Sequence, residues 1–285
     1  MRHPDVPESL EGWWILHRMF GFDRRRWMEH PAPDKSDAAT EFVAALLDLK
    51  ERQDADAGIA ALVGHKADLM LTHYGRSFEA IAQAQVKVDA CALIDFLEPR
   101  DSYVSVLELG LYEATAKIHE ALRHKELTPF SPQWNDAFDA MLREQAEHPR
   151  NAERLWARIP QRRYVCFYPM DKKRGESVNW YLLPYAERAR LMLDHGKIGR
   201  TFHGRMTQVI SGSVGYDDYE WGVDLYADDP LVFKKLIYEM RFDEASARYA
   251  EFGPFFSGMQ FSIGGFSAFL DGEIPALRES EPAAV

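Results

Sequence analysis

The stretch "RMTQVISGSVGYDDYEWGVDLYA", residues 205–227, contains two apolar runs separated by a polar, glycine-containing turn. Residues 205–213 and 219–227 alternate in polarity and are rich in β-branched and aromatic side chains, which predicts two strands joined as a hairpin. The acidic pair Asp217 and Asp218 falls where turn residues are expected. The stretch therefore predicts the central hairpin of an antiparallel sheet.

Predicted helices flank this hairpin, and predicted strands lie beyond the helices. Apolar residues recur with helical spacing in 184–196 and, with a break, in 230–253. Strand-like runs follow at 163–170 and 255–261. The second half of the chain therefore has the order βαββαβ.

The first half of the chain repeats this order. Its predicted elements are a strand at 12–22, a helix at 38–52, apolar stretches at 58–65 and 67–75, a helix at 77–97 and a strand at 102–112. Two such series predict an α+β protein of two tandem ferredoxin-like units, each with an antiparallel sheet that is covered by helices on one face and open on the other. The expected boundaries are an N-terminal unit at 10–119, a linker at 120–161 with a short helix near 137–145, and a C-terminal unit at 162–270.

Composition narrows the functional classes. A formal net charge of -11 over 285 residues argues against general nucleic-acid binding, which requires a basic face. No run approaches the ~20 apolar residues of a membrane span, and the first residues are too polar and acidic for a signal peptide, so we expect a cytoplasmic protein. Cys91 and Cys166 lack metal-ligand spacing and are expected as small core residues. Motifs of zinc hydrolases, P-loop proteins and dinucleotide-binding proteins are absent from the sequence.

One segment departs from the acidic balance. Residues 154–174 hold seven basic side chains against Asp171, which gives +6; the basic residues are Arg154, Arg158, Arg162, Arg163, Lys172, Lys173 and Arg174. Arginine forks and lysine ammonium groups bind carboxylates and phosphates, so the segment could hold a small polyanion. The alternative is a solvated surface.

Three other side chains are candidates for a site. His195 precedes Gly196, which predicts a helix end there, and it shares a face with Leu191; it could point into a pocket or complement the helix dipole. Gln208 is polar on an apolar strand face, so it either has a protein partner or faces a ligand cavity. Tyr168 ends its strand before Pro169, where its phenol could reach a cleft or lie in the core.

At these residues the chain resembles the coproheme decarboxylases of the chlorite dismutase-like family, in the branch with a distal glutamine. The match covers nearly all of residues 164–261, and weaker similarity is found in "GWWILHRMF" and "GHKADLML". The matching stretches are "YPMDKKR", "NWYLLP", "ERARLMLDHGKIGR" and "QVISGSVGYDDYEWGVDLYADDPLVFKKLIYEMRFDEASARYAEFGPFF". The resemblance implies a dimeric α+β barrel fold, with haem bound to the C-terminal unit, and a ring-shaped homopentamer.

The resemblance also implies roles for individual residues. His195 corresponds to the proximal ligand of the porphyrin iron, Tyr168 to the residue oxidised to a radical, and Gln208 to the distal residue, which is arginine in chlorite-degrading relatives. Lys172 matches a position that holds a propionate, and it is the candidate for orienting the reacting carboxylate or managing a proton near it. The other implied pocket residues are Arg154 and Ser246 at the propionates, Met170 beside Tyr168, and the cation Arg241.

The implied reaction converts iron coproporphyrin III to haem b. Hydrogen peroxide is the oxidant, and propionates 2 and 4 leave as carbon dioxide, with vinyl groups remaining. Transient contact with a coproporphyrin ferrochelatase is also implied. Three alternatives remain open on the sequence: a haem peroxidase or chlorite-degrading enzyme, a non-catalytic haem carrier, and a structural oligomer in which His195 only caps a helix.

Overall fold

The computed structural model describes residues 6–277. Its strands are β1 (Ser9–Phe22), β2 (Ala55–Leu62), β3 (Leu69–Gly75), β4 (Leu97–Gly110), β5 (Tyr164–Lys172), β6 (Met206–Gly212), β7 (Trp221–Ala227), β8 (Ala250–Phe252) and β9 (Phe256–Gln260). Its helices are α1 (Arg24–Glu29), α2 (Ala32–Glu51), α3 (Phe78–Asp89), α4 (Tyr112–His124), α5 (Pro132–Glu147), α6 (Pro149–Leu155), α7 (Tyr185–Thr201), α8 (Leu231–Met240), α9 (Glu244–Tyr249) and α10 (Phe266–Leu270). Short 3₁₀ turns occur at Ala92–Phe96, Trp180–Leu182 and Ile263–Gly265.

The strands form one antiparallel sheet that closes on itself. The order is β7-β6-β4-β1-β3-β2-β9-β5-β8, and β5 also pairs with β7, so eight strands complete a ring. The ninth strand, β8, pairs with the last residues of β5. The two halves of the chain are joined where β4 pairs with β6 and where β2 pairs with β9. The predicted α+β fold with antiparallel pairing is confirmed, and the two expected sheets are parts of a single barrel.

The side-chain alternation of the strands divides the buried residues between the inside and the outside of the barrel. The interior is lined by large side chains that include Trp13, Ile15, Tyr74, Phe167 and Tyr226. A buried pair also lies inside, because His17 Nε2 is 3.0 Å from Asp224 Oδ1 and the His17 ring stacks on Phe167. Closure of the ring therefore buries polar and apolar groups from both halves of the chain.

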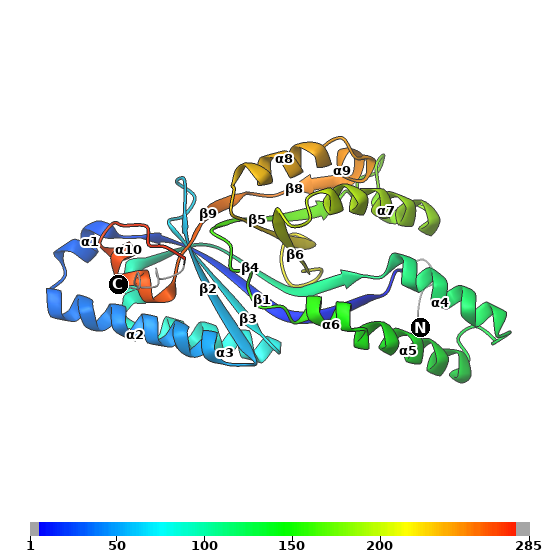
Figure 1. The fold of residues 1–285 in the computed structure, drawn as a ribbon, viewed down its shortest axis with the longest axis horizontal. Helices are drawn as coiled ribbons and strands as arrows, with labels where there is room; N and C mark the ends of the chain where they lie inside the picture. Colours follow the sequence, from blue (N-terminus) through cyan, green and yellow to red (C-terminus); the bar gives the residue numbers. More distant parts are fainter. Residues whose placement is uncertain (1–5, 278–285) are drawn as a thin grey trace, which may run out of the picture.

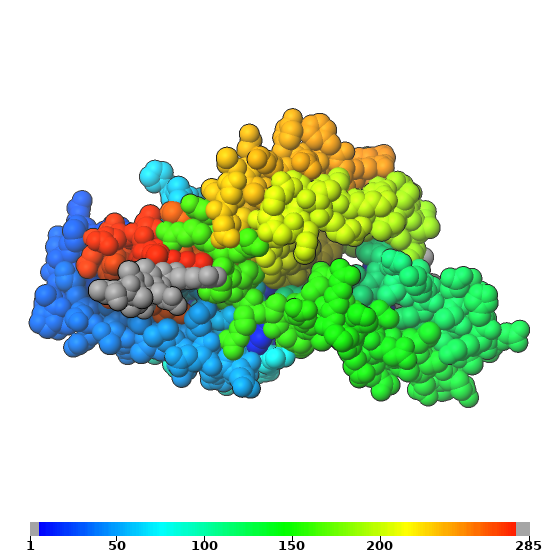
Figure 2. All heavy atoms as spheres, viewed as in Figure 1, coloured from blue at the N-terminus to red at the C-terminus, as the bar shows by residue number. Residues whose placement is uncertain are grey.

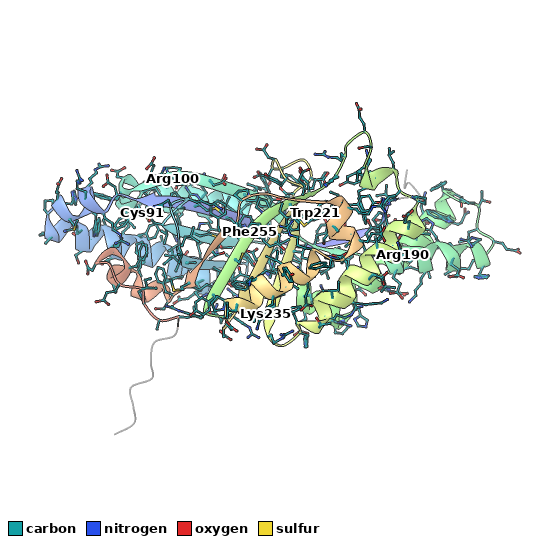
Figure 3. All side chains as sticks on the ribbon, turned by 90° about the horizontal axis from the view of Figure 1, so that it is seen from above. Cys91, Arg100, Arg190, Trp221, Lys235 and Phe255 are labelled. Atoms are coloured by element: carbon teal, nitrogen blue, oxygen red, sulfur yellow. The ribbon has the colours of Figure 1, made fainter. Side chains whose placement is uncertain are left out.

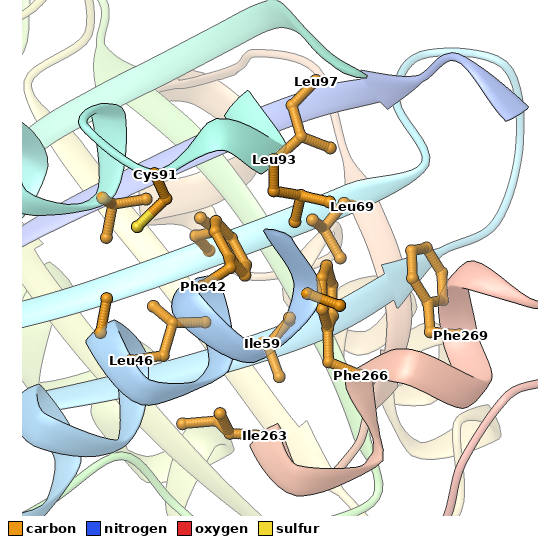
Figure 4. Close-up of a cluster of buried hydrophobic side chains, with 14 of the residues drawn as sticks. Phe42, Leu46, Ile59, Leu69, Cys91, Leu93, Leu97, Ile263, Phe266 and Phe269 are labelled. Atoms are coloured by element: carbon orange, nitrogen blue, oxygen red, sulfur yellow. The ribbon is translucent and has the colours of Figure 1, made fainter. Parts of the chain in front are cut away.

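Helices cover the outer face of the sheet in two separate places. At one end, α2, α3 and α10 pack on β2 and β3 around Phe42, Leu69 and Phe266 (Figure 4). At the other end, α7, α8 and α9 lie over β5, β6 and β8 (Figure 1). The core there contains Cys166, Tyr168 and residues of α8. Both cysteines are buried free thiols, and Cys91 lies in the first of these cores.

Several predicted elements end at different residues from those expected. The helix expected at 77–97 ends at Asp89, because Cys91 takes an extended conformation and starts the turn into β4. The helix expected at 230–253 breaks between α8 and α9, and its last residues form β8. The segment 120–161 carries the end of α4 and all of α5 and α6 rather than one short helix. Ile118, Leu122, Trp134 and Phe138 give these helices a core of their own, which explains why the polar segment is ordered.

Within residues 6–277, no helix is both long enough and apolar enough to cross a membrane. Seen from above, Arg190 and Lys235 lie on the helical side, and Trp221 and Phe255 lie nearer the strands (Figure 3). Helices α7 and α8 thus form the outer layer over the part of the barrel that holds most of the candidate residues.

Candidate functional site

Helix α7 carries His195 but does not end there. The helix continues through Gly196 to Thr201, and Gly196 is not among the glycines with positive φ. The chain turns only after Phe202, where Gly204 has φ +81°. The predicted helix end at Gly196 is therefore wrong. Since His195 lies almost two turns before the end, the interpretation as a residue that complements the helix terminus also fails.

The imidazole of His195 is held by a carboxylate. Its Nδ1 lies 3.0 Å from Oδ2 of Asp243 and 3.4 Å from Oγ of Ser246, while Asp243 and Ser246 are both buried. A carboxylate at Nδ1 favours the tautomer that carries the proton on Nδ1, so the lone pair is left on Nε2. This is the arrangement that a metal-binding histidine requires.

Asp243 is fixed in this position by its own helix. It is the N-cap residue of α9, and its Oδ1 accepts a hydrogen bond of 2.9 Å from the backbone N–H of Ala245. Burial opposes the charged form, but hydrogen bonds from His195 and Ser246 hold the pKa of the Asp243 carboxyl below its usual value. Sequence reasoning missed Asp243. An aspartate at the predicted break in 230–253 is the one local signal that could have marked a helix cap, and its pairing with His195 depends on the packing of α9 against α7.

Ser246 lies beside His195 rather than apart from it. Its expected role, at a propionate, remains a prediction, and in this structure its hydroxyl contacts the imidazole Nδ1. The structure thus brings Ser246 and His195 together.

Tyr168, Met170 and Lys172 lie on one face of β5, because residues two apart on a strand point to the same side. The ring of Tyr168 is buried, stacks on Phe255 at 4.6 Å and lies 5.7 Å from Phe252. Burial raises the pKa of the Tyr168 phenol, so it is protonated at neutral pH. The phenol is therefore a neutral group in an aromatic environment and could act as a donor of a hydrogen atom.

Lys172 is a buried cation close to the His195 pair. Its Nζ donates a hydrogen bond of 3.3 Å to the carbonyl of Ala245 and lies 4.6 Å from the ring centroid of Trp180. Burial lowers the pKa of Lys172 to about 8, although the nearby carboxylates of Asp243 and Glu220 favour its charge. The ammonium group thus lies near the carboxylate that orients the imidazole.

Arg241 approaches the tyrosine from the other side. It follows α8, and its guanidinium carbon lies 4.2 Å from the ring centroid of Phe252, which is a neighbour of Tyr168. Its positive charge acts against the rise in the pKa of Tyr168. Within the described part of the chain, Arg241 has no carboxylate partner, so its charge is available to an anionic ligand.

Gln208 lies on the same sheet face as Tyr168. Strand β7 pairs with both β6 and β5: Gln208 of β6 is opposite Leu225, and Tyr168 of β5 is opposite Val223. Leu225 and Val223 are two residues apart on β7 and therefore point to the same face. Gln208 is half-buried, and its amide makes no hydrogen bond within residues 6–277. Ile210, on the same strand face, is 40% exposed. The interpretation of Gln208 as a residue with a protein partner is therefore not supported, and its amide remains free to contact a ligand.

Arg154 is separated from this cluster. It is exposed on α6, which packs on β1 and β4. Figure 2 shows a hollow between α6 and α7, with β6 at its base. Arg154 makes no ion pair within the described residues, and α6, which carries it, borders this hollow on the side opposite α7.

The segment 154–174 does not form one basic surface. Arg158 donates hydrogen bonds to the backbone carbonyls of Lys50 and Ala55, while Arg162 pairs with Asp228. Arg163 donates to the carbonyls of Gln260 and Pro275. The segment therefore does not present all seven basic side chains to one ligand, because several of them fasten it to neighbouring elements.

His195 and the side chains around it fit a metal ion that already carries most of its ligands when it binds. Among residues 6–277, no group of three or more histidine, cysteine or carboxylate side chains could hold a bare metal ion. One imidazole with a free Nε2 is sufficient for the iron of a porphyrin, because the macrocycle supplies four nitrogen ligands. Lys172, Arg241 and Arg154 are then available for carboxylates at its edge.

Comparison with known proteins agrees with this geometry. A coproheme decarboxylase of Thermus thermophilus is 40% identical to this chain, over 94% of the chain and 98% of its own length. A Natronomonas pharaonis protein with a haem-binding name is 38% identical over 94% of this chain, which spans 42% of that longer protein. The solved structure of a haem-binding protein from Thermus thermophilus covers 95% of this chain, with a TM-score of 0.80 and 39% identity.

The chlorite dismutase family model matches residues 35–261, which include every strand of the barrel except β1 and the cluster around His195. Together with the identity of about two residues in five over nearly the whole chain, this match shows that the chain belongs to the chlorite dismutase family.

Proposed function

We propose that this protein is a coproheme decarboxylase, which removes propionates 2 and 4 of iron coproporphyrin III to form haem b with hydrogen peroxide as the oxidant. The observation that carries the proposal is the placement of Tyr168 and Lys172 on the strand face next to the His195–Asp243 pair. An iron ligand, an oxidisable phenol and a buried cation are the three groups that the reaction needs. The name of the Thermus thermophilus relative supports the same activity.

Different residues would bind the iron, the propionates and the two faces of the porphyrin. His195 Nε2 would hold the iron, and Asp243 would keep the imidazole oriented and electron-rich. Lys172 and Arg241 would contact propionates from the β5 side, and Arg154 from the α6 rim. Met170 would line the pocket beside Tyr168, and Gln208 would donate a hydrogen bond on the opposite face of the ring, since a neutral amide is not a base.

The substrate iron, with peroxide, supplies the oxidising equivalents. Tyr168 loses an electron and its phenolic proton, and the resulting radical takes a hydrogen atom from the β-carbon of a propionate. Loss of a second electron then lets the carboxylate leave as carbon dioxide, with a vinyl group remaining. Each propionate consumes one peroxide and one proton and yields carbon dioxide and two waters, so the complete reaction needs two peroxides.

Lys172 is the candidate for orienting the reacting carboxylate. Its pKa of about 8 leaves most of the ammonium charged at neutral pH. A charged Lys172 can hold the propionate near Tyr168, and this positioning accounts for its expected effect on rate. Haem b has two carboxylates fewer than the substrate, so it should bind these cations less tightly and leave.

The decisive experiment mixes the purified protein with iron coproporphyrin III and follows the porphyrin mass as peroxide is added. Two successive losses of a formic-acid equivalent would support the assignment. Binding without loss of mass would instead indicate a haem carrier. Evolution of oxygen from chlorite by the same sample would favour the chlorite-degrading alternative.

The assembly and location belong to the same proposal. We infer a cytoplasmic homopentamer that receives its substrate from a coproporphyrin ferrochelatase by transient contact. Light scattering on the eluted protein tests the pentamer: a mass near five times 32.8 kDa is expected. A monomer at micromolar concentration would contradict it.

A further inference from the structure

Helix α7 is incompletely covered for a helix that packs on a barrel. Of its 17 residues only Arg188 and Leu191 are fully buried, whereas the ten residues of α8 include four that are buried. Beyond His195, the residues Ile198 and Gly199 are only half-buried. The face of α7 that carries His195 and Gly199 is thus only partly covered, and the hollow of Figure 2 adjoins this helix.

No packing contact within the described residues requires a glycine at position 199. A Cβ built there would lie 3.6 Å from Cε of Met240 and 4.0 Å from Oε1 of Gln208, which are ordinary van der Waals distances. The residue does not have positive φ, so its backbone conformation does not require glycine. Glycine weakens a helix relative to alanine. Alanine would therefore fit and stabilise the ligand-free fold.

The position of Gly199 connects it to the iron ligand. It follows His195 by four residues, so the two lie on the same face of α7, one turn apart. The amide of Gln208 lies across from Gly199 and makes no hydrogen bond within the described chain. Because the amide has no partner to lose, it can move away from the helix when a ligand enters.

We propose that Gly199 is the contact point at which the flat face of the porphyrin lies directly against the backbone of α7. A planar macrocycle held by His195 must approach the same helix face closely, and a bare glycine permits the shortest approach. A methyl group there would hold the ring away from α7 and weaken its packing on the helix. This inference rests on the proposed function, because it assigns a specificity-determining contact to the same ligand.

The test compares Gly199→Ala with Gly196→Ala, both in the full-length protein. Gly196 is a matched control, because it lies in the same helix and a Cβ there would meet only the guanidinium of Arg200, at 3.4 Å. Three quantities are measured for each variant: the melting temperature without ligand, the affinity for iron coproporphyrin III from the Soret band, and the affinity for metal-free coproporphyrin III from its fluorescence. The metal-free probe separates ring packing from iron ligation.

Both substitutions should raise the melting temperature of the ligand-free protein, by about 2 °C each. Only Gly199→Ala should weaken binding, by roughly tenfold for both porphyrins. Wild-type affinity in Gly199→Ala, an equal loss in Gly196→Ala, or a lower melting temperature for Gly199→Ala would each overturn the inference. If the wild-type protein bound neither porphyrin, the proposed function itself would fall.

Discussion

The Nζ of Lys172 lies 4.6 Å from the ring centroid of Trp180 and donates a hydrogen bond to the carbonyl of Ala245, one residue before Ser246. An ammonium group over an indole ring is attracted by the negative face of the π system, which favours its charged form at a site from which most water is excluded. The same contact fixes the direction of a side chain with four rotatable bonds. Trp180 thus positions the cation that is proposed to contact a propionate of the substrate.

Coproheme binding should weaken above about pH 8. Lys172 has its pKa lowered from 10.5 to about 8, so it is mostly charged below pH 8 and loses its proton as the pH rises through that value. Affinity should then fall by up to about tenfold per pH unit, because only the charged form attracts the propionate. Titrations from pH 6 to 9.5 measure this.

Two variants of Lys172 give the control for this pH dependence. Lys172→Arg keeps its charge through the whole range, so it should remove the pH dependence. Lys172→Met should bind weakly at every pH. A slope that persists in Lys172→Met would assign the titration to another group.

Tyr168→Phe should bind coproheme with unchanged affinity but should produce no vinyl group. The substitution keeps the stacking on Phe255 and removes only the hydroxyl, so packing is preserved while the hydrogen-atom donor is lost. Mass spectrometry of the porphyrin after peroxide addition measures the product, and the Soret shift measures binding. Tyr164→Phe, on the same strand face, is the control and should retain activity. Normal vinyl formation in Tyr168→Phe would exclude the proposed role.

Asp243→Asn should weaken the coordination of iron by His195 without unfolding the protein. Asparagine is as good an N-cap residue as aspartate, so the hydrogen bond to Ala245 is preserved and stability should change by less than about 1 kcal/mol. The neutral amide is a poorer acceptor for the imidazole N–H, so coproheme affinity or activity should fall by about 10–100-fold. The ferric/ferrous potential should become more positive.

Asp243→Glu serves as the rescue variant for this test. It restores the charge but displaces it by one methylene, so a partial return of the potential is expected. An unchanged potential in Asp243→Asn would show that the carboxylate does not act through His195.

The stability of the protein should fall in acid through His73. This imidazole is fully buried, and burial, with a smaller contribution from the charges of Arg18 and His17, lowers its pKa from 6.5 to about 3. Between those two pH values the unfolded chain binds the proton and the folded chain does not. The free energy of unfolding should therefore decrease by up to about 1.4 kcal/mol per pH unit as the pH falls below about 6.

Urea denaturation at pH 7, 6, 5 and 4 tests this expectation. His73→Leu should flatten the slope between pH 6 and 4, whereas His124→Leu, whose side chain is 81% exposed, should leave it unchanged. If the slope were equal in both variants, the acid sensitivity would belong to other groups.

Local patterns predicted much of the fold because the physical cause of each element is local. The hairpin of β6 and β7, the strands of the first half and helix α8 follow from the periodicity of apolar residues. Gly196 misled the prediction of the end of α7, since glycine is common just after a helix end but also occurs inside helices. The segment 120–161 is folded because of apolar residues that form a core only when α4 and α5 pack on each other, so its helices were not all evident from local patterns.

The sequence by itself determined the class of the fold, the strand face that Tyr168 shares with Cys166, and the similarity to a known family. Only the tertiary structure decided that the two sheets close into one barrel, that Lys172 continues the strand of Tyr168, and that Asp243 pairs with His195. It also decided that Arg158, Arg162 and Arg163 fasten the basic segment to neighbouring elements. The reason is physical: periodicity along the chain selects which side of an element is buried. Hydrogen bonds between residues 48 apart, as in the His195–Asp243 pair, depend on how whole elements pack.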